Sequence, residues 1–333
     1  MNKILKNEGN IMSKYAKEPD YKRVKLDMPF TGITSFKKYP ICTNLDELDA
    51  DIAIIGVPND MTTAWRSGAR MGPRSIREQS SLYAFGSGYD HEKDIMYDND
   101  GFKIVDCGDV SIINGDVEQS HENTEEAIRK IISKGAMPIV LGGDHSVTNP
   151  VAFALDSHEK VNVVQIDAHL DWLKDVSGNR YTLSNPMRRM SEMSHINKMA
   201  QLGIRGVGSS QKDDFDDARA YGSKILSPKQ IRKMGIEESL KGMPNGEKYY
   251  VTIDIDGLDA SLAPGAGSPS PGGFNYDEVS EILEAVAKKG DVIGFDLVEV
   301  NPLYDHSGVT SQIAARLIID FINYIIYEKK NKA

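Results

Sequence analysis

The chain has 333 residues, of which 40% are hydrophobic and 26% are charged, enough to bury the core of one large α/β domain or two smaller ones. Its formal net charge of -10 argues against nucleic acid and membrane surfaces as partners, because phosphate contacts need clustered Lys and Arg; a small cationic substrate fits better. Two cysteines, Cys42 and Cys107, provide neither a disulfide framework nor a thiolate-rich zinc module, which is typical of the cytoplasm.

The N-terminal residues lack the features of a targeting signal. Residues 1–20 are rich in Lys, Asn and Glu and contain no continuous apolar core, so we expect no secretory signal. We expect residues 1–30 to form a loose extension. Residues 31–333 are expected to form a single domain, because the chain shows no tandem repeat, low-complexity tract or Pro/Ser-rich linker.

Apolar, β-branched runs alternate with amphipathic helical patterns along the chain. The runs predict strands at 52–55, 102–105, 138–141, 161–166, 199–204, 249–255 and 292–300. Between them, one helix is expected to begin at Thr124 and to stop before Gly135, and another spans Asp277 to Lys289. Residues 316–327 predict an amphipathic closing helix, and no segment reads as a transmembrane span. Repeated strand–helix–strand units predict a mostly parallel sheet with helices on both faces.

Three polar segments directly follow predicted strands. They read GGDHS at 142–146, DAHLD at 167–171 and DIDGLD at 254–259. In an open parallel sheet the ligand crevice lies beyond the carboxyl ends of the strands, so we expect the three segments to meet there. Residues two apart in an extended segment project to the same side, which pairs Asp167 with His169 and Asp254 with Asp256.

These segments supply six candidate metal ligands. Taken singly, each could be a hydrogen-bonded structural histidine or a helix-capping aspartate. Together, four carboxylates in one crevice would repel one another and lose their hydration, at a cost that two divalent cations would cancel. Oxygen and imidazole donors without sulfur favour Mn²⁺, with Ni²⁺, Co²⁺, Fe²⁺ and Zn²⁺ as alternatives. The candidates are His145, Asp167, His169, Asp171, Asp254 and Asp256.

The motifs resemble those of ureohydrolases, the family of arginase and agmatinase. The resemblance extends from about Asp51 to the C-terminal helix and implies a three-layer α/β fold around a parallel sheet of about eight strands, in a trimer or hexamer. The supporting segments are GARMGP at 68–73 with Ile76 and Arg77, DCGDV at 106–110, APG at 263–265 and EVNP at 299–302.

The resemblance also implies roles for individual residues. Glu299 would pair with the substrate guanidinium through charge-assisted hydrogen bonds, where the alternative is a surface acid at a strand end. Asp144 is expected to orient a ligand. Coordination lowers the pKa of water to ~7, so that attack on the guanidino carbon would release urea and an amine. One Mn²⁺ would be bound by His145, Asp167, Asp171 and Asp254, and a second by His169, Asp167, Asp254 and Asp256.

The stretch after Asp171 departs from the family pattern. Leu183 occupies the place of a histidine proposed to move protons to the leaving amine, and Trp172 replaces a smaller polar residue of agmatinases. We expect Trp172, Leu183 and Asn185 to line the substrate pocket. Agmatine, cleaved to putrescine and urea, is the leading substrate; the alternatives are 4-guanidinobutyrate, 3-guanidinopropionate and guanidine.

Two other classes of protein remain open from the residues alone. A deacetylase of the same broad fold uses one zinc ion and would not need His145 or Asp171. A non-catalytic metal-binding relative is suggested by Leu183, which cannot carry a proton.

Overall fold

The computed structural model describes residues 28–84, 88–208 and 210–332. One compact unit begins at Thr34. Residues 1–27 of the predicted extension lie outside the described residues, so that the boundary near residue 30 and the single domain after it stay predictions.

An eight-stranded sheet forms the centre of this unit, in the order β4-β1-β5-β10-β9-β6-β7-β8. Every neighbouring pair in it is parallel, which confirms the predicted sheet. A short antiparallel pair, β2 (Tyr89–Asp90) and β3 (Ile95–Met96), lies outside it. The strands of the main sheet are β1 Ile52–Val57, β4 Ile104–Asp109, β5 Met137–Gly142, β6 Val161–Ile166, β7 Ile196–Leu202, β8 Lys224–Leu226, β9 Lys248–Asp254 and β10 Asp291–Val298.

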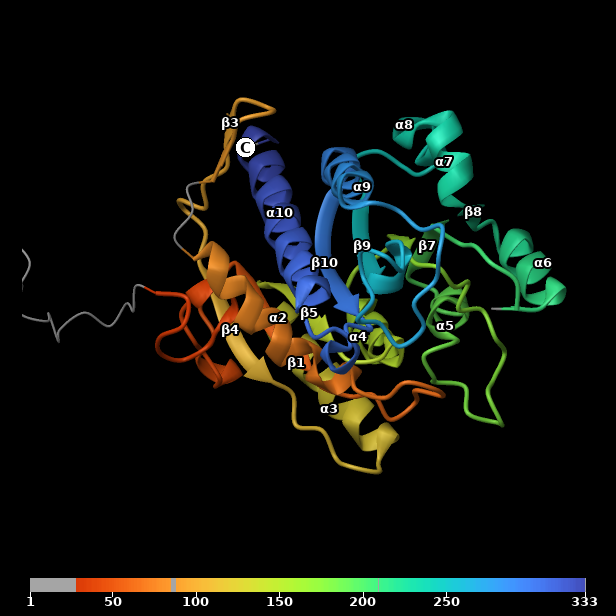
Figure 1. The fold of residues 1–333 in the computed structure, drawn as a ribbon, viewed down its shortest axis with the longest axis horizontal. Coiled ribbons are helices and arrows are strands. Elements are labelled where there is room, and N and C mark those ends of the chain that lie inside the picture. Colours follow the sequence, from red (N-terminus) through yellow and green to blue (C-terminus); the bar gives the residue numbers. More distant parts are fainter. Residues whose placement is uncertain (1–27, 85–87, 209, 333) are drawn as a thin grey trace, which may run out of the picture. The chain divides into compact units, whose positions relative to one another are not determined.

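Helices cover both faces of the sheet and make three layers (Figure 1). Successive strand residues face opposite sides, so that Ile54 packs in a core with α2, α7, α9 and α10, whereas Ile55 packs in a second core with α3, α4, α5 and α6. The helices are α2 Gly72–Ser80, α3 Val117–Ser133, α4 Thr148–Ala154, α5 Pro186–Ser191, α6 Lys212–Tyr221, α7 Pro228–Met234, α8 Ile236–Ser239, α9 Tyr276–Lys289 and α10 Val309–Lys332.

The predicted start of α3 at Thr124 is wrong. The helix begins at Val117, and Asp116 caps it by accepting a hydrogen bond from the backbone N–H of Gln119. Thr124 lies inside the helix, fully buried, and its hydroxyl donates to the carbonyl of Ser120. A Thr followed by acids resembles a cap locally, but the helix continues toward its N-terminus because residues before Thr124 also pack on the domain.

The closing helix α10 is longer than predicted. Its apolar stretch is long enough to cross a membrane by composition, but 72% of that stretch is buried inside the structure. Leu317, Phe321 and Ile325 pack in the core with α9, at the helical spacing that the sequence predicted. Its burial therefore marks α10 as a core helix of this fold.

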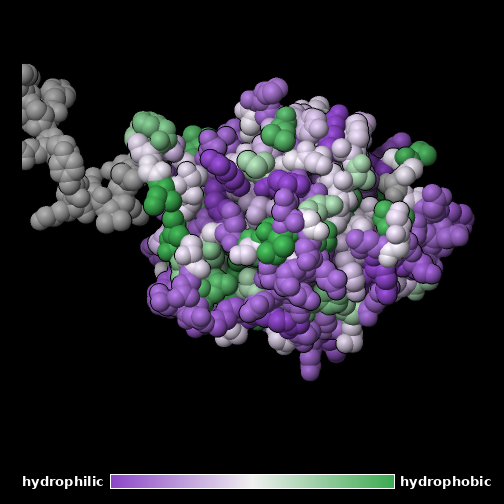
Figure 2. Space-filling model, turned by 90° about the horizontal axis from the view of Figure 1, so that it is seen from below, coloured by the Kyte–Doolittle hydropathy of each residue, from purple (hydrophilic) through white to green (hydrophobic). Residues whose placement is uncertain are grey.

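The four central strands carry the polar segments at their carboxyl ends. His145 follows β5, Asp167 follows β6, Asp254 ends β9 and Glu299 directly follows β10. Because neighbouring parallel strands end at the same edge, the sheet collects these residues there, as predicted. Figure 2 shows the molecule from the side toward which β10 runs in Figure 1, and this face is largely hydrophilic, with separate hydrophobic patches.

Candidate metal centre and active site

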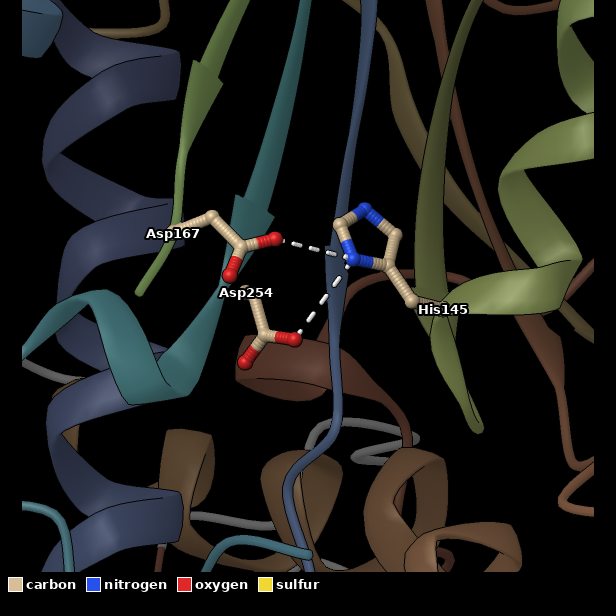
Figure 3. Close-up of side chains that lie close together, drawn as sticks. All are labelled: His145, Asp167 and Asp254. Carbon is tan, nitrogen blue, oxygen red and sulfur yellow. Dashed lines mark ion pairs between the residues drawn. The ribbon is translucent and has the colours of Figure 1, made fainter. Parts of the chain in front are cut away.

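Three carboxylates surround one nitrogen of the buried His145 ring. Nδ1 lies 2.8 Å from Asp171 Oδ2, 3.1 Å from Asp167 Oδ2 and 3.5 Å from Asp254 Oδ2. Figure 3 shows this nitrogen facing the carboxylates of Asp167 and Asp254. Although it is buried, Nδ1 makes no hydrogen bond of acceptable geometry. An orphaned imidazole nitrogen among carboxylate oxygens is the donor set of a divalent cation.

A second group of ligand atoms lies beside the first and shares Asp167 with it. His169 Nδ1 is 3.1 Å from Asp256 Oδ2 and 3.6 Å from Asp167 Oδ1. In each group, His145 with Asp167 and Asp254 or Asp167 with His169 and Asp256, the ligand atoms lie within 4.8 Å of one another. The structure thus brings all six predicted ligands together, Asp171 through its contact with His145.

The pKa values of this cluster show how crowded its charges are. Burial, with the charge of Asp167, raises the pKa of Asp171 to about 7, and burial together with Asp256 raises that of Asp254 well above its usual range. The charge of Asp256 raises the pKa of His169 to about 12 despite the opposing effect of burial. In the metal-free protein, therefore, protons hold part of the positive charge that two cations could supply, and the residues fit a pair of metal ions.

Glu299 is a buried acid beside this cluster. Its Oε1 accepts a 2.9 Å hydrogen bond from the backbone N–H of His145, while Oε2 faces Gly267, where a Cβ atom would come within 2.8 Å of it. Burial and the charge of Asp144 raise the pKa of Glu299 to about 8. A cation next to Oε2 would relieve this cost, which suits a guanidinium.

Two of these acids adopt the left-handed backbone conformation that favours glycine. Asp171 has φ 52° and Glu299 has φ 66°. Such positions cost about 1–3 kcal/mol each and persist where the surrounding structure holds them. The unusual backbone conformation sets the direction of both carboxylates. Its conformational cost indicates a functional site.

Thermal stability of the metal-free protein is expected to fall as pH rises from about 5 to 8. The folded-state pKa values of Asp171 (about 7) and Glu299 (about 8) lie above those of the unfolded chain, so folding is favoured at low pH and loses this contribution as pH rises through them. With Mn²⁺ present the trend should reverse, because protons compete with the metal. Melting temperatures measured over this pH range, once in chelator and once in excess Mn²⁺, test this. The prediction is contradicted if the melting temperature changes with pH in the same way under both conditions.

Asp144, directly before His145, joins two backbone segments at the site. Its buried carboxylate accepts hydrogen bonds from the backbone N–H and hydroxyl of Thr62, at 2.9 and 2.8 Å, and from the N–H and hydroxyl of Ser146. Burial raises the pKa of Asp144, which these four donors oppose. Asp144 thus holds the backbone at Thr62 and at Ser146, the residue after His145; that this orients the ligand stays a prediction.

The predicted pocket residues differ in where the structure places them. The Leu183 N–H donates to Thr62 Oγ1, so Leu183 lies next to the hydroxyl that binds Asp144. Asn185 braces its own loop, because its amide oxygen accepts from the N–H and hydroxyl of Thr182. Trp172 is 2% exposed and packs in the core against Tyr221. Substrate contact by these residues stays a prediction, which Leu183 fits best.

A polar row inside the sheet supports the site and was not predicted. Gln201, Gln165, Thr252 and Asp296 are register partners on β7, β6, β9 and β10, and all are fully buried. Gln165 Nε2 donates to Asp167 Oδ2 at 2.7 Å, and Gln201 Nε2 donates to Gln165 Oε1. A polar residue inside an apolar strand is the signal that could have revealed them, because a buried polar group needs a partner.

Known proteins are similar to this chain in sequence and in fold. The arginase family model matches residues 50–323. A guanidinobutyrase of Pseudomonas aeruginosa is 33% identical, over 89% of this chain and 93% of the relative, and an agmatinase of Bacillus anthracis is 31% identical, over 90% and 98%. The solved structure of proclavaminate amidinohydrolase from Streptomyces clavuligerus matches with a TM-score of 0.82 and 29% identity, over 90% of this chain and 99% of that one.

The chain has a parallel sheet with two groups of histidine and aspartate side chains at its carboxyl edge, and the relatives that share this fold are hydrolases. The chain belongs to the arginase family, and it is a hydrolase that acts on guanidino compounds. The predicted resemblance is confirmed, and this family depends on a binuclear metal centre.

Proposed function

We propose that this chain is a binuclear-metal amidinohydrolase that cleaves a linear guanidino compound to urea and an amine. The observation that carries the proposal is the pair of ligand groups that share the buried Asp167. One ion would be held by His145, Asp167, Asp171 and Asp254, and the other by His169, Asp167, Asp254 and Asp256. Oxygen and imidazole donors support Mn²⁺, with Ni²⁺ as the alternative.

The chain's own residues bind and orient the substrate in this proposal. When bound, the metal ions lower the pKa of water and so supply a nucleophile near neutral pH. Glu299 Oε2 pairs with the guanidinium N–H groups and holds the central carbon, which resonance makes a poor electrophile, at the cluster. Leu183 cannot deliver a proton to the leaving amine, so water or a carboxyl group of the site must do so.

Agmatine is the leading substrate. Its two positive charges suit a protein of net charge -10 with an acidic site, and an agmatinase is among the relatives. A urea-release assay over agmatine, arginine, 4-guanidinobutyrate, 3-guanidinopropionate and guanidine, with protein loaded with Mn²⁺ or with Ni²⁺, tests this. Turnover of agmatine far above the others is expected, and preference for an acid or for guanidine would overturn the choice.

A second candidate substrate, 4-guanidinobutyrate, is favoured by Arg66. The guanidinium carbon of Arg66 lies 4.2 Å from the ring centroid of Trp65 and 4.8 Å from that of Tyr304. Among the described residues, Arg66 forms no ion pair. Asn301 Nδ2 donates to the Arg66 carbonyl, and Asn301 is two residues from Glu299. A cation held by two aromatic rings near the site could bind a carboxylate tail.

Replacing Arg66 with alanine separates the two substrates. Agmatine and 4-guanidinobutyrate differ at the tail, an amine in one and a carboxylate in the other. If Arg66 binds the tail, the variant should raise KM for 4-guanidinobutyrate about 10- to 100-fold and leave that for agmatine nearly unchanged. Arg66→Lys, which keeps the charge, is the matched control. Equal changes with both substrates would exclude this role.

The remaining alternatives have distinct outcomes. A filled pair of metal sites without urea release from any substrate would favour a non-catalytic relative. One tightly bound metal per chain would favour deacetylase-like chemistry, which membership of the arginase family argues against.

The assembly and the cellular location of the protein stay proposals. The first is a homo-oligomer, trimeric or hexameric, which a native mass measurement tests, and the second is a cytoplasmic location. Cys42 and Cys107 are both free thiols, which is compatible with the second.

A further inference from the structure

The second nitrogen of the His145 ring begins a hydrogen-bond relay that leads into the core. Nε2 lies 2.9 Å from Thr252 Oγ1, and the Thr252 hydroxyl donates a 2.6 Å hydrogen bond to Asp296 Oδ1. Thr252 and Asp296 are direct partners across β9 and β10. The other oxygen of Asp296, Oδ2, accepts from the hydroxyls of Tyr250 and Thr148, at 2.5 and 2.9 Å.

The chemistry of this relay gives it a direction. A carboxylate only accepts hydrogen bonds, so the hydrogen of the Thr252 hydroxyl is committed to Asp296. The Thr252 oxygen can then only accept from His145, which requires a proton on Nε2. The neutral imidazole that binds a metal carries one N–H, so Nδ1 then has a free lone pair. Nδ1 is the ring nitrogen that faces Asp167, Asp171 and Asp254.

We propose that Asp296, acting through Thr252, is a positioning residue that holds His145 in the Nε2–H tautomer and so makes Nδ1 available as a metal ligand. The inference rests on the proposed metal centre. It concerns two residues that are not among the proposed metal ligands. Both are fully buried, and polar groups so placed are retained in a core only when their hydrogen bonds are satisfied.

Asparagine at position 296 would reverse the relay. An amide has one accepting oxygen and one donating NH₂ group, and two hydroxyl donors, Tyr250 and Thr148, meet on the Oδ2 side. The amide oxygen should take that side, which turns the NH₂ group toward Thr252. The Thr252 hydroxyl would then donate to His145 Nε2, and the ring proton would move to Nδ1, where it blocks metal binding. Asp296→Asn should therefore weaken metal binding more than removal of the Thr252 hydroxyl does.

Metal binding by substituted proteins tests the relay. Thr252→Val should weaken Mn²⁺ binding at one of the two sites about 10- to 100-fold, with the other site within a few-fold of wild type, as measured by calorimetric titration. Thr252→Ser keeps the hydroxyl and should restore binding. Thr124→Val, which removes another fully buried threonine hydroxyl inside α3, is the matched control and should bind as wild type does.

A spectroscopic readout separates the relay from a general loss of packing. With ¹⁵N-labelled histidine and Zn²⁺ as a diamagnetic probe, wild type and Thr252→Ser should show one metal-bound ring with a slowly exchanging proton on Nε2. That signal should be lost or exchange rapidly in Thr252→Val.

The Mn²⁺ titration separates failure of the relay from failure of the proposed function. If wild type binds two Mn²⁺ ions and Thr252→Val does too with unchanged affinity, the relay is refuted and the proposed function survives. If wild type binds no metal pair, both fail.

Discussion

Replacing Asp254 with asparagine is expected to lower urea release by about 10³-fold or more, because the site loses a ligand that both proposed metal ions share. The change is nearly isosteric. The amide oxygen can still accept the hydrogen bond that Asp254 Oδ1 receives from the backbone N–H of Asp256. Metal content should fall from two ions per chain to one or fewer, measured by elemental analysis after gel filtration.

The same substitution should make the metal-free protein more stable. Burial and the neighbouring Asp256 raise the pKa of Asp254 well above its usual range, so an ionised Asp254 destabilises the fold near neutral pH without metal. A raised melting temperature together with lost activity excludes misfolding as the cause. Asp259→Asn is the matched control: it lies in the same motif, but its carboxylate accepts from Ser261, Gly272 and Gly273, outside the cluster. Full activity with two bound ions in Asp254→Asn would refute the shared ligand.

Glu299→Gln is expected to lower kcat/KM about 10²- to 10³-fold while both metal ions stay bound. The amide oxygen can keep the hydrogen bond from the His145 N–H, so the backbone at this proposed metal ligand is preserved. What is lost is the negative charge that faces the guanidinium. Steady-state kinetics with metal quantified on the same samples measures this.

Two further results would decide how Glu299 acts. Glu281→Gln, on the exposed face of α9, should leave the kinetics unchanged and serves as the control. Loss of metal from Glu299→Gln would instead indicate that Glu299 supports the cluster through His145. Unchanged kcat/KM would show that the guanidinium binds elsewhere.

The strands and their polar ends could be predicted from short stretches of sequence. Apolar runs such as Ile52–Val57 are continuous because both faces of a central parallel strand are covered, and the pattern can be recognised without knowing which strands lie beside it. The three-residue strand β8 could not be found in this way, because it is too short to carry a pattern. The false start at Thr124 has a related cause, since a local cap signal competes with packing that only the fold reveals.

The candidate ligands were visible in the sequence, whereas the groups that hold them were not. Asp167, His169 and Asp171 lie within one short motif, so local spacing was enough to group them. Thr252 and Asp296 are 44 residues apart and meet through the register of β9 and β10. Trp172 directly follows a candidate ligand in the sequence, and only the structure shows that its ring packs in the core; its contact with substrate stays a prediction.

By itself the sequence determined the fold class, the six acidic and histidine ligand candidates and the family, because strand periodicity and short motifs are local properties of the chain. The tertiary structure alone decided which nitrogen of His145 faces the carboxylates, that Asp171 and Glu299 are aimed by left-handed backbones, and which buried polar residues support them. These features depend on strand register and on desolvation, which arise only when distant segments pack together.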